Sequence, residues 1–178
     1  MKIKTQTRTE QVLAVMPILA WVAFIGFMIE AGAILVSYSV SCVNPEATKN
    51  FYKGLDLYNL SQFNFWYYTT YVLFMVVLSV IKSCITFQVI KILSRFNLEN
   101  PFTMEVANRL EKISYIAFGA WLVTLLSAAY TSLILKLTGK LYGSPSSGEF
   151  IFMVGLVFII AQVFKRGVEI QSDNDLTI

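Results

Sequence analysis

The polar side chains most able to do chemistry in this sequence lie inside otherwise apolar stretches. Four of them recur at i, i+3, i+4 and i+7, the spacing of one helical face: Ser79, Lys82, Ser83 and Thr86. A charged group at the centre of a bilayer costs about 3 kcal/mol or more, so such groups face protein or water and often mark a pathway for an ion or substrate. We therefore expect this polar stripe to point into a helix bundle or a wet cavity.

Glu30 is the acidic counterpart of Lys82 in an earlier apolar stretch. Counting ~1.5 Å per residue from predicted inner ends at Val12 and Leu93 places the two residues ~11 Å apart in depth. Long side chains, helix tilt or water would have to close that gap. Three interpretations stay open: an ion pair, a role in transport, and two snorkelling or locally solvated groups without a functional role. In the last apolar stretch, Gln162 is predicted to form a hydrogen bond between helices near the inner face.

A third apolar stretch carries small residues at strict four-residue spacing: Ala120, Thr124, Ala128 and Ser132. Small residues repeated in this way let two membrane helices approach closely. The ridge is therefore predicted to be a packing surface rather than a chemical site. It would pack either within the bundle or between subunits of a homo-oligomer.

The residue types that enzymes need most are sparse. The sequence contains no histidine, and its two cysteines, Cys42 and Cys84, are predicted at different depths, which makes a disulfide between them implausible. The commonest general base and the usual transition-metal and haem ligand sets are therefore missing. We expect no catalytic residue, no metal site and no cofactor, and the net charge of +3 is too small to indicate direct nucleic-acid binding.

Four long apolar stretches must position these residues. They cover about 12–38, 67–93, 115–137 and 147–165 in a chain that is 56% hydrophobic. An α-helix needs ~20 residues to cross a ~30 Å hydrocarbon core, and it satisfies its own backbone hydrogen bonds there. The sequence therefore predicts an all-α integral membrane four-helix bundle, a single transmembrane domain over residues 1–178, with membrane lipid around it.

The distribution of basic residues predicts the orientation. Of the 14 lysines and arginines, nine lie in the N-terminus, the second loop and the C-terminal tail, four lie in the first and third loops, and Lys82 lies within a span. Short loops rich in Lys and Arg stay on the cytoplasmic side. We therefore expect a multi-pass protein with both termini in the cytoplasm.

The loops carry local signals. Asn44-Pro45-Glu46 is a good helix start and predicts a short amphipathic helix on the outer membrane face. An aromatic cluster follows, which indicates an interfacial belt, with a ligand pocket as the alternative: Phe63, Phe65, Trp66, Tyr67, Tyr68 and Tyr71. In the second loop, Thr103 can cap a helix that begins at Met104, and Glu105 and Arg109 then stand at a favourable i, i+4 spacing.

Two strings on the predicted cytoplasmic side are the most distinctive. The second loop contains Asn100-Pro101-Phe102, and residues 164–178 read Phe-Lys-Arg-Gly-Val-Glu-Ile-Gln-Ser-Asp-Asn-Asp-Leu-Thr-Ile. Together they resemble the bacterial four-span membrane-protein family known only as domain of unknown function number twenty-nine seventy-five. Its tail has the form Phe-x-x-Gly-x-x-(Leu or Ile)-Gln, then acidic residues, then Asp-Leu-Thr-(Val or Ile). The resemblance covers essentially the whole chain, and the tail is its specific part.

That family's genes often neighbour one for a small Cro/C1-type helix-turn-helix regulator. The resemblance therefore implies a protein of the bacterial inner (plasma) membrane that partners such a regulator. The residues implied in partner binding are Asn100, Pro101, Phe102, Asp175, Leu176, Thr177 and Ile178. The acidic tail would add to the partner as an edge strand, or else fold back on the bundle.

Two classes of function follow. The favoured one is a regulatory or sensory membrane protein that binds a cytoplasmic helix-turn-helix regulator. The alternative is a small transporter or channel subunit that uses Glu30 and the polar stripe around Lys82. Structural and immunity-type proteins cannot be separated from the first class by sequence.

Overall fold

The computed structural model describes residues 8–44, 46, 57–94, 103–140, 142 and 148–175 of the 178-residue chain. In these ranges the secondary structure is helical, which confirms the all-α prediction. The α-helices are α1 (Arg8–Val43), α2 (Tyr58–Phe63), α3 (Phe65–Leu93), α4 (Met104–Thr138) and α5 (Gly148–Asp175).

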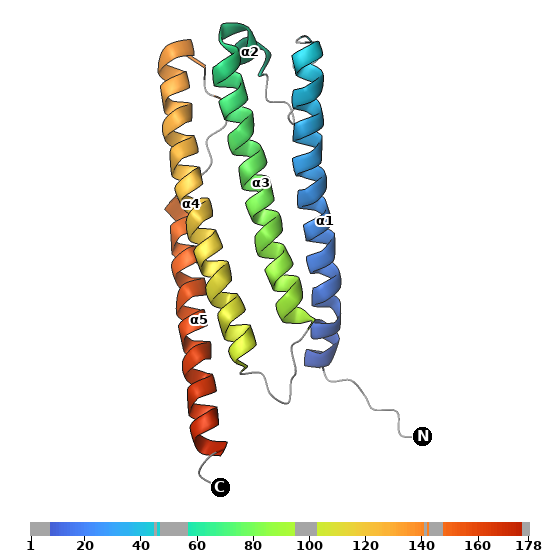
Figure 1. Ribbon diagram of the computed structural model, residues 1–178, viewed down its shortest axis with the longest axis vertical. Coiled ribbons are helices and arrows are strands. Elements are labelled where there is room, and N and C mark those ends of the chain that lie inside the picture. The colour runs from blue at the N-terminus through green and yellow to red at the C-terminus, as the bar shows by residue number, and fades with distance from the viewer. Residues whose placement is uncertain are drawn as a thin grey trace, which may run out of the picture.

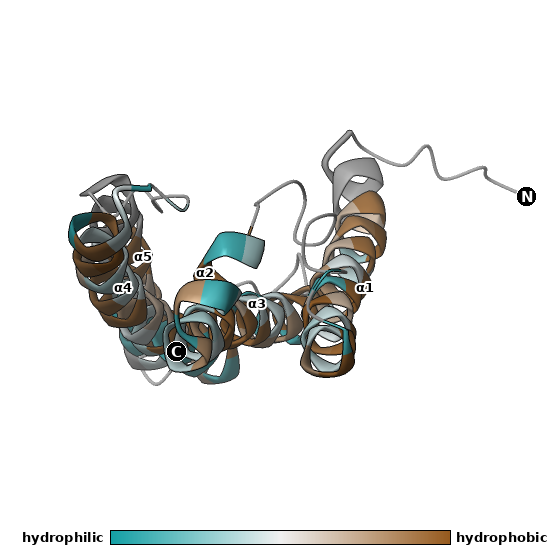
Figure 2. Ribbon diagram, turned by 90° about the horizontal axis from the view of Figure 1, so that it is seen from above, coloured by the Kyte–Doolittle hydropathy of each residue, from teal (hydrophilic) through white to brown (hydrophobic). Residues whose placement is uncertain are grey.

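The four long helices lie side by side, each antiparallel to the next (Figure 1). Helix α1 packs against α3, α3 against α4, and α4 against α5, while the short α2 lies on α3. In the described ranges, α1 makes no comparable contact with α4 or α5. Seen along the helices, α1 lies at one edge of the molecule and α4 and α5 at the other (Figure 2). The helices therefore pack as an open row rather than as a closed bundle.

Helix α1 begins and α5 ends at the same end of this row (Figure 1). We call it the inner end, following the predicted orientation, and the opposite end the outer end. The orientation itself stays a prediction.

Three helices are long and apolar enough to cross a membrane, over Ala14–Val43, Phe65–Leu93 and Met104–Thr138. Many of their large apolar side chains are exposed, as the surface of a lipid-immersed helix requires. Helix α5 is not one of these three. Its described side chains, residues 154–172, include three charged residues, Lys165, Arg166 and Glu169. The predicted fourth span, about 147–165, therefore stays a prediction.

Local capping signals fix both ends of α4. The Thr103 hydroxyl accepts a hydrogen bond from the Val106 backbone N–H at 3.3 Å, and Arg109 pairs with Glu105 at 2.8 Å. These contacts confirm the predicted start at Met104. The helix ends at Gly139, whose φ of 68° lies in the left-handed region that glycine adopts without strain.

The first loop is only partly described. Its predicted amphipathic helix falls mostly on residues 45 and 47–56, outside the described ranges. The Asn44 side chain does accept a hydrogen bond from the Glu46 backbone N–H at 3.2 Å, as a helix cap would. The short helix that is described, α2, begins only at Tyr58.

The aromatic cluster that follows divides into two groups. Tyr68 and Tyr71 are buried, and they join a core at the outer end together with Leu57, Leu60 and Ile134. In contrast, Phe63, Phe65 and Trp66 are exposed, where an interfacial belt would place them. The belt interpretation therefore fits the exposed members and is wrong for the two buried tyrosines.

Candidate functional site: the α1–α3 seam

The contact between α1 and α3, which we call the seam, brings together the two helices that carry Glu30 and the polar stripe around Lys82. Buried residues recur along it at intervals of three, four or seven residues, the spacings that keep side chains on one face of a helix. On α1 these are Ala31, Ile34 and Ser41, and on α3 they include Val72, Ser79 and Ser83.

The polar stripe of α3 divides between two environments. Ser79 and Ser83 are each only 3% exposed, in the seam. Lys82 is exposed, and Thr86 is half-buried and donates a hydrogen bond to the Lys82 carbonyl at 2.8 Å. Lys82 therefore does not point into a helix bundle of its own chain, and the alternative, that it faces a wet cavity, stays a prediction. At ~100° per residue the stripe is ~100° wide, and contact with a single neighbouring helix covers only part of it.

The depth of Lys82 also differs from the sequence estimate. Its ammonium lies 5.8 Å from the centre of the Phe27 ring, within the range of a cation–π contact. Lys82 is therefore level with Phe27, only three residues or ~4.5 Å along the axis from Glu30. The estimate of ~11 Å was wrong because α1 extends past the inner end of α3 (Figure 1).

Glu30 itself is half-buried and has an interaction within the chain. An ion pair between Glu30 and Lys82 stays a prediction. What the structure adds is that the two charges lie at nearly the same level of the membrane.

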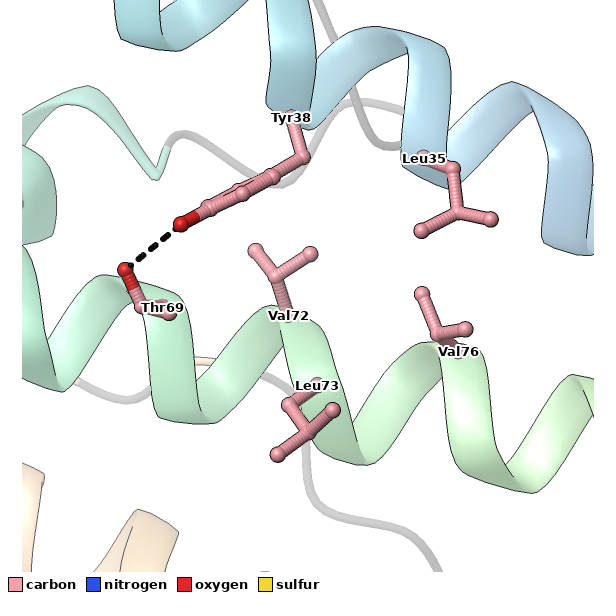
Figure 3. A pocket seen from close by; sticks show the side chains of 6 residues that line it. All are labelled: Leu35, Tyr38, Thr69, Val72, Leu73 and Val76. Carbon is pink, nitrogen blue, oxygen red and sulfur yellow. Dashed lines mark hydrogen bonds between the residues drawn. The ribbon is translucent and has the colours of Figure 1, made fainter.

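Two small cavities flank this level. The outer one, of about 100 Å³, is apolar apart from the Tyr38 and Thr69 hydroxyls, which are 3.1 Å apart. Figure 3 shows Leu35 and Val76 pointing toward each other across it. The inner one, of about 190 Å³, is lined by six residues: Phe24, Met28, Val80, Ser83, Cys84 and Phe87. Both are smaller than typical sites for drug-sized ligands, ~300–1,000 Å³.

Ser83 is the unusual member of the inner cavity. Its hydroxyl oxygen is buried and has no hydrogen-bond partner among the described residues. A buried hydroxyl without a partner is unfavourable, and each such group in a native protein calls for an explanation. Here the neighbouring cavity gives the side chain room to reorient.

A second polar group, between α4 and α5, was not predicted. The Lys165 ammonium of α5 lies 2.7 Å from the Glu111 carboxylate of α4, and the Gln162 and Tyr115 side chains also interact with that carboxylate. The Gln162 contact is of the helix-to-helix kind predicted for it. Lys165 and Glu111 are 54 residues apart, so no local spacing in the sequence indicates their pairing.

A cavity of about 360 Å³ lies beside this group. Its lining is mostly apolar and comes from α4 and α5: Ser114, Tyr115, Phe118, Val154, Gly155 and Phe158. On the other side of α4, Arg109 donates to the Gln88 amide oxygen of α3 at 3.4 Å. Polar side chains thus link α3, α4 and α5 near the inner end.

The small-residue ridge of α4 is only partly used. Ala120 and Thr124 are buried, Ala128 is half-buried and Ser132 is exposed. The ridge therefore packs within the chain at its inner half. The predicted homo-oligomer through Ala120, Thr124, Ala128 and Ser132 stays a prediction.

Most of the predicted partner-binding residues lie outside the described ranges, namely Asn100, Pro101, Phe102, Leu176, Thr177 and Ile178. Asp175 is the last residue of α5. The acidic segment from Glu169 to Asp175 is helical in the chain by itself. Helical continuation satisfies its backbone hydrogen bonds within the chain. Edge-strand pairing of the tail with a partner stays a prediction.

Comparison with known proteins identifies one family. The family model described as "Protein of unknown function (DUF2975)" matches residues 12–178, which confirms the resemblance carried by the loop and tail strings. No curated protein and no solved structure matches the chain.

Proposed function

We propose that this chain, which belongs to the DUF2975 family of unknown function, has a regulatory or sensory role in a bacterial inner membrane. In this proposal the termini are cytoplasmic. The loop after α3 and the end of α5 bind a small helix-turn-helix regulator.

The observation that carries the proposal is the continuity of α5. It is one helix of 28 residues, ~42 Å long, that begins beside the middle of α4 and ends at Asp175, beyond the inner end of α4 (Figure 1). The Lys165–Glu111 ion pair joins α5 to α4 just before the charged last turns of α5. A change of packing around α5 would therefore be transmitted along a rigid element to the tail.

The charge of the last turns supports a basic partner. Arg166 is paired with Glu169 at 2.6 Å. From Ser172 onward the charged side chains are both acidic, Asp173 and Asp175. Helix-turn-helix proteins carry basic surfaces because they bind DNA phosphates. An acidic helical tail complements such a surface and would compete with DNA for it.

A transporter remains the second candidate, because Glu30 and Lys82 lie at nearly the same level. One observation argues against a transport pathway along the polar stripe. Ser79 and Ser83 lie in the seam, whereas Lys82 lies outside it. If the transporter assignment is right, Glu30→Gln or Lys82→Met abolishes flux while the protein stays folded.

Co-purification tests the regulatory role. The full chain and a chain lacking Asp173–Ile178 would be isolated from native membranes, and their partners identified by mass spectrometry. We expect a small helix-turn-helix protein with the full chain, and its loss from the truncated one. Glu46→Gln, which removes an acid on the outer side, is the matched control and should keep the partner. An unchanged partner list after truncation would contradict the proposal.

A further inference from the structure

The exposed ammonium of Lys82 calls for a neighbour outside the chain. Lys82 lies ~16 Å along α3 from its end at Leu93, too deep for a side chain of this length to reach the interface comfortably. Moving a cation to such a depth in lipid costs free energy, about 3 kcal/mol on insertion scales. The ring of Phe27 covers only one side of it.

Glu30 and Lys82 lie on the same face of the α1–α3 pair. The inner cavity marks the opposite face, since Met28 of α1 and Cys84 of α3 line it. Residues two apart in a helix point ~160° away from each other. Glu30, two residues after Met28, and Lys82, two residues before Cys84, therefore both point to the face without the cavity.

The side chains also lean toward a common depth. Side chains of a helix lean toward its N-terminus. Lys82 on the descending α3 leans outward, and Glu30 on the ascending α1 leans inward, which narrows the ~4.5 Å between their levels. One face of the molecule thus presents an acid and a base at nearly one depth.

We propose that this face is a dimer interface, in which Glu30 of each protomer pairs with the partner's Lys82. A two-fold axis along the membrane normal keeps every residue at its own depth. It therefore brings the acid of one copy to the base of the other, twice, in an isologous interface. Such an arrangement is available only because the two residues share a face and a level.

A second copy fits better than lipid or an unrelated protein. Lipid chains offer no anion at this depth, whereas the chain itself carries one at the right level. Glu30 also has an interaction within its own chain, and in the dimer the partner's Lys82 is a further contact for the Glu30 carboxylate. The inference is independent of the regulatory role, because dimerisation and tail binding involve different faces and different assays.

Disulfide trapping provides the readout. Gly26 is one turn before Glu30 on the same face, it is exposed, and a Cβ there meets nothing within 4 Å. In the proposed dimer α1 of one copy faces α3 of the other, so the two cysteines belong on those two helices, one turn from Glu30 and Lys82. Gly26→Cys in one tagged copy and Thr86→Cys in a second, both with the native cysteines changed to serine, should give a disulfide-linked mixed dimer in native membranes. A chain whose one cysteine is the native Cys84, on the opposite face, is the matched control and should not.

Charge reversal then tests the pairing. When both copies of this cysteine pair also carry Glu30→Lys, or both carry Lys82→Glu, like charges face each other across the interface, and the dimer yield should fall by about tenfold, the effect of a 1.4 kcal/mol change. Co-expressing the two single variants with different tags should restore a mixed dimer, because both contacts become complementary again. Recovery of the mixed dimer also shows that both variants fold.

The alternatives give different results. An ion pair within one chain predicts recovery in the doubly reversed chain but none in the mixture of single variants. An absent dimer, a yield insensitive to charge, or a Gly26→Cys disulfide to a different protein would each overturn the inference.

Discussion

The outer and inner ends of the helix row are held together by different chemistry. At the outer end, aromatic rings are buried and hydroxyls bond between helices: those of Ser41 and Tyr68 lie 2.6 Å apart, and the Tyr130 hydroxyl donates to the Tyr67 carbonyl at 3.1 Å. At the inner end, the contacts between helices include the ion pair of Lys165 with Glu111 and the contact of Arg109 with Gln88.

The difference indicates which end can move. Buried rings in close contact have few alternative arrangements, because a packed core does not deform continuously. Partly exposed ion pairs contribute little to stability and exchange readily with water. The outer end is therefore expected to act as the fixed part of the row, and the inner end as the adjustable part, where the proposed regulator would bind.

The largest expected effect comes from emptying the outer core. Tyr68 is 0% exposed and carries a hydrogen bond to Ser41, so Tyr68→Ala should lower the free energy of unfolding by about 3 kcal/mol or more. Thermal unfolding in detergent would measure it. Trp66→Ala, at a site 76% exposed, is the control and should change little. Equal losses in the two variants would mean that the outer end is not the fixed part.

A smaller effect is expected at the inner end. Lys165→Met removes one partner of the α4–α5 pair, so α5 should exchange its amide hydrogens faster, while the melting temperature falls less than in Tyr68→Ala. The double variant Glu111→Gln with Lys165→Met removes both charges and should recover much of the protection. If protection is lost equally from α1 and α3, the ends are coupled and the comparison fails.

The smallest effect, and one of opposite sign, is expected at Ser83. Its hydroxyl is buried without a partner, so Ser83→Ala should leave the free energy of unfolding unchanged or raise it by up to about 1 kcal/mol. Ser114→Ala is the matched control, because that buried hydroxyl donates to the Glu111 carbonyl at 2.7 Å. Its loss should lower stability by about 1 kcal/mol. Clear destabilisation by Ser83→Ala would indicate a partner in the membrane.

Features encoded by neighbouring residues could be predicted from the sequence. The start of α4 followed from Thr103 and from the spacing of Glu105 and Arg109, and the long helices followed from apolar runs. Such signals act within one or two helical turns, so no knowledge of the fold is needed to interpret them.

Features that depend on how helices sit against each other could not be predicted. The level of Lys82 depends on how far α1 extends past α3, and the division of the stripe depends on α1 covering only part of it. The Lys165–Glu111 pair joins residues far apart in the chain. Apolar periodicity identifies which residues enter a membrane, but not the vertical offset or the rotation of one helix against another.

The two free thiols have a practical consequence. Cys42 is exposed in the last turn of α1 at the outer end, whereas Cys84 is exposed on the side of α3 at lipid depth. Since alkylation requires a thiolate, which forms only where water reaches the sulfur, reagents dissolved in water distinguish the two. The native chain thus contains a chemical marker for each environment, and a membrane-impermeant maleimide that modifies Cys42 on whole cells would establish which end of the row faces outward.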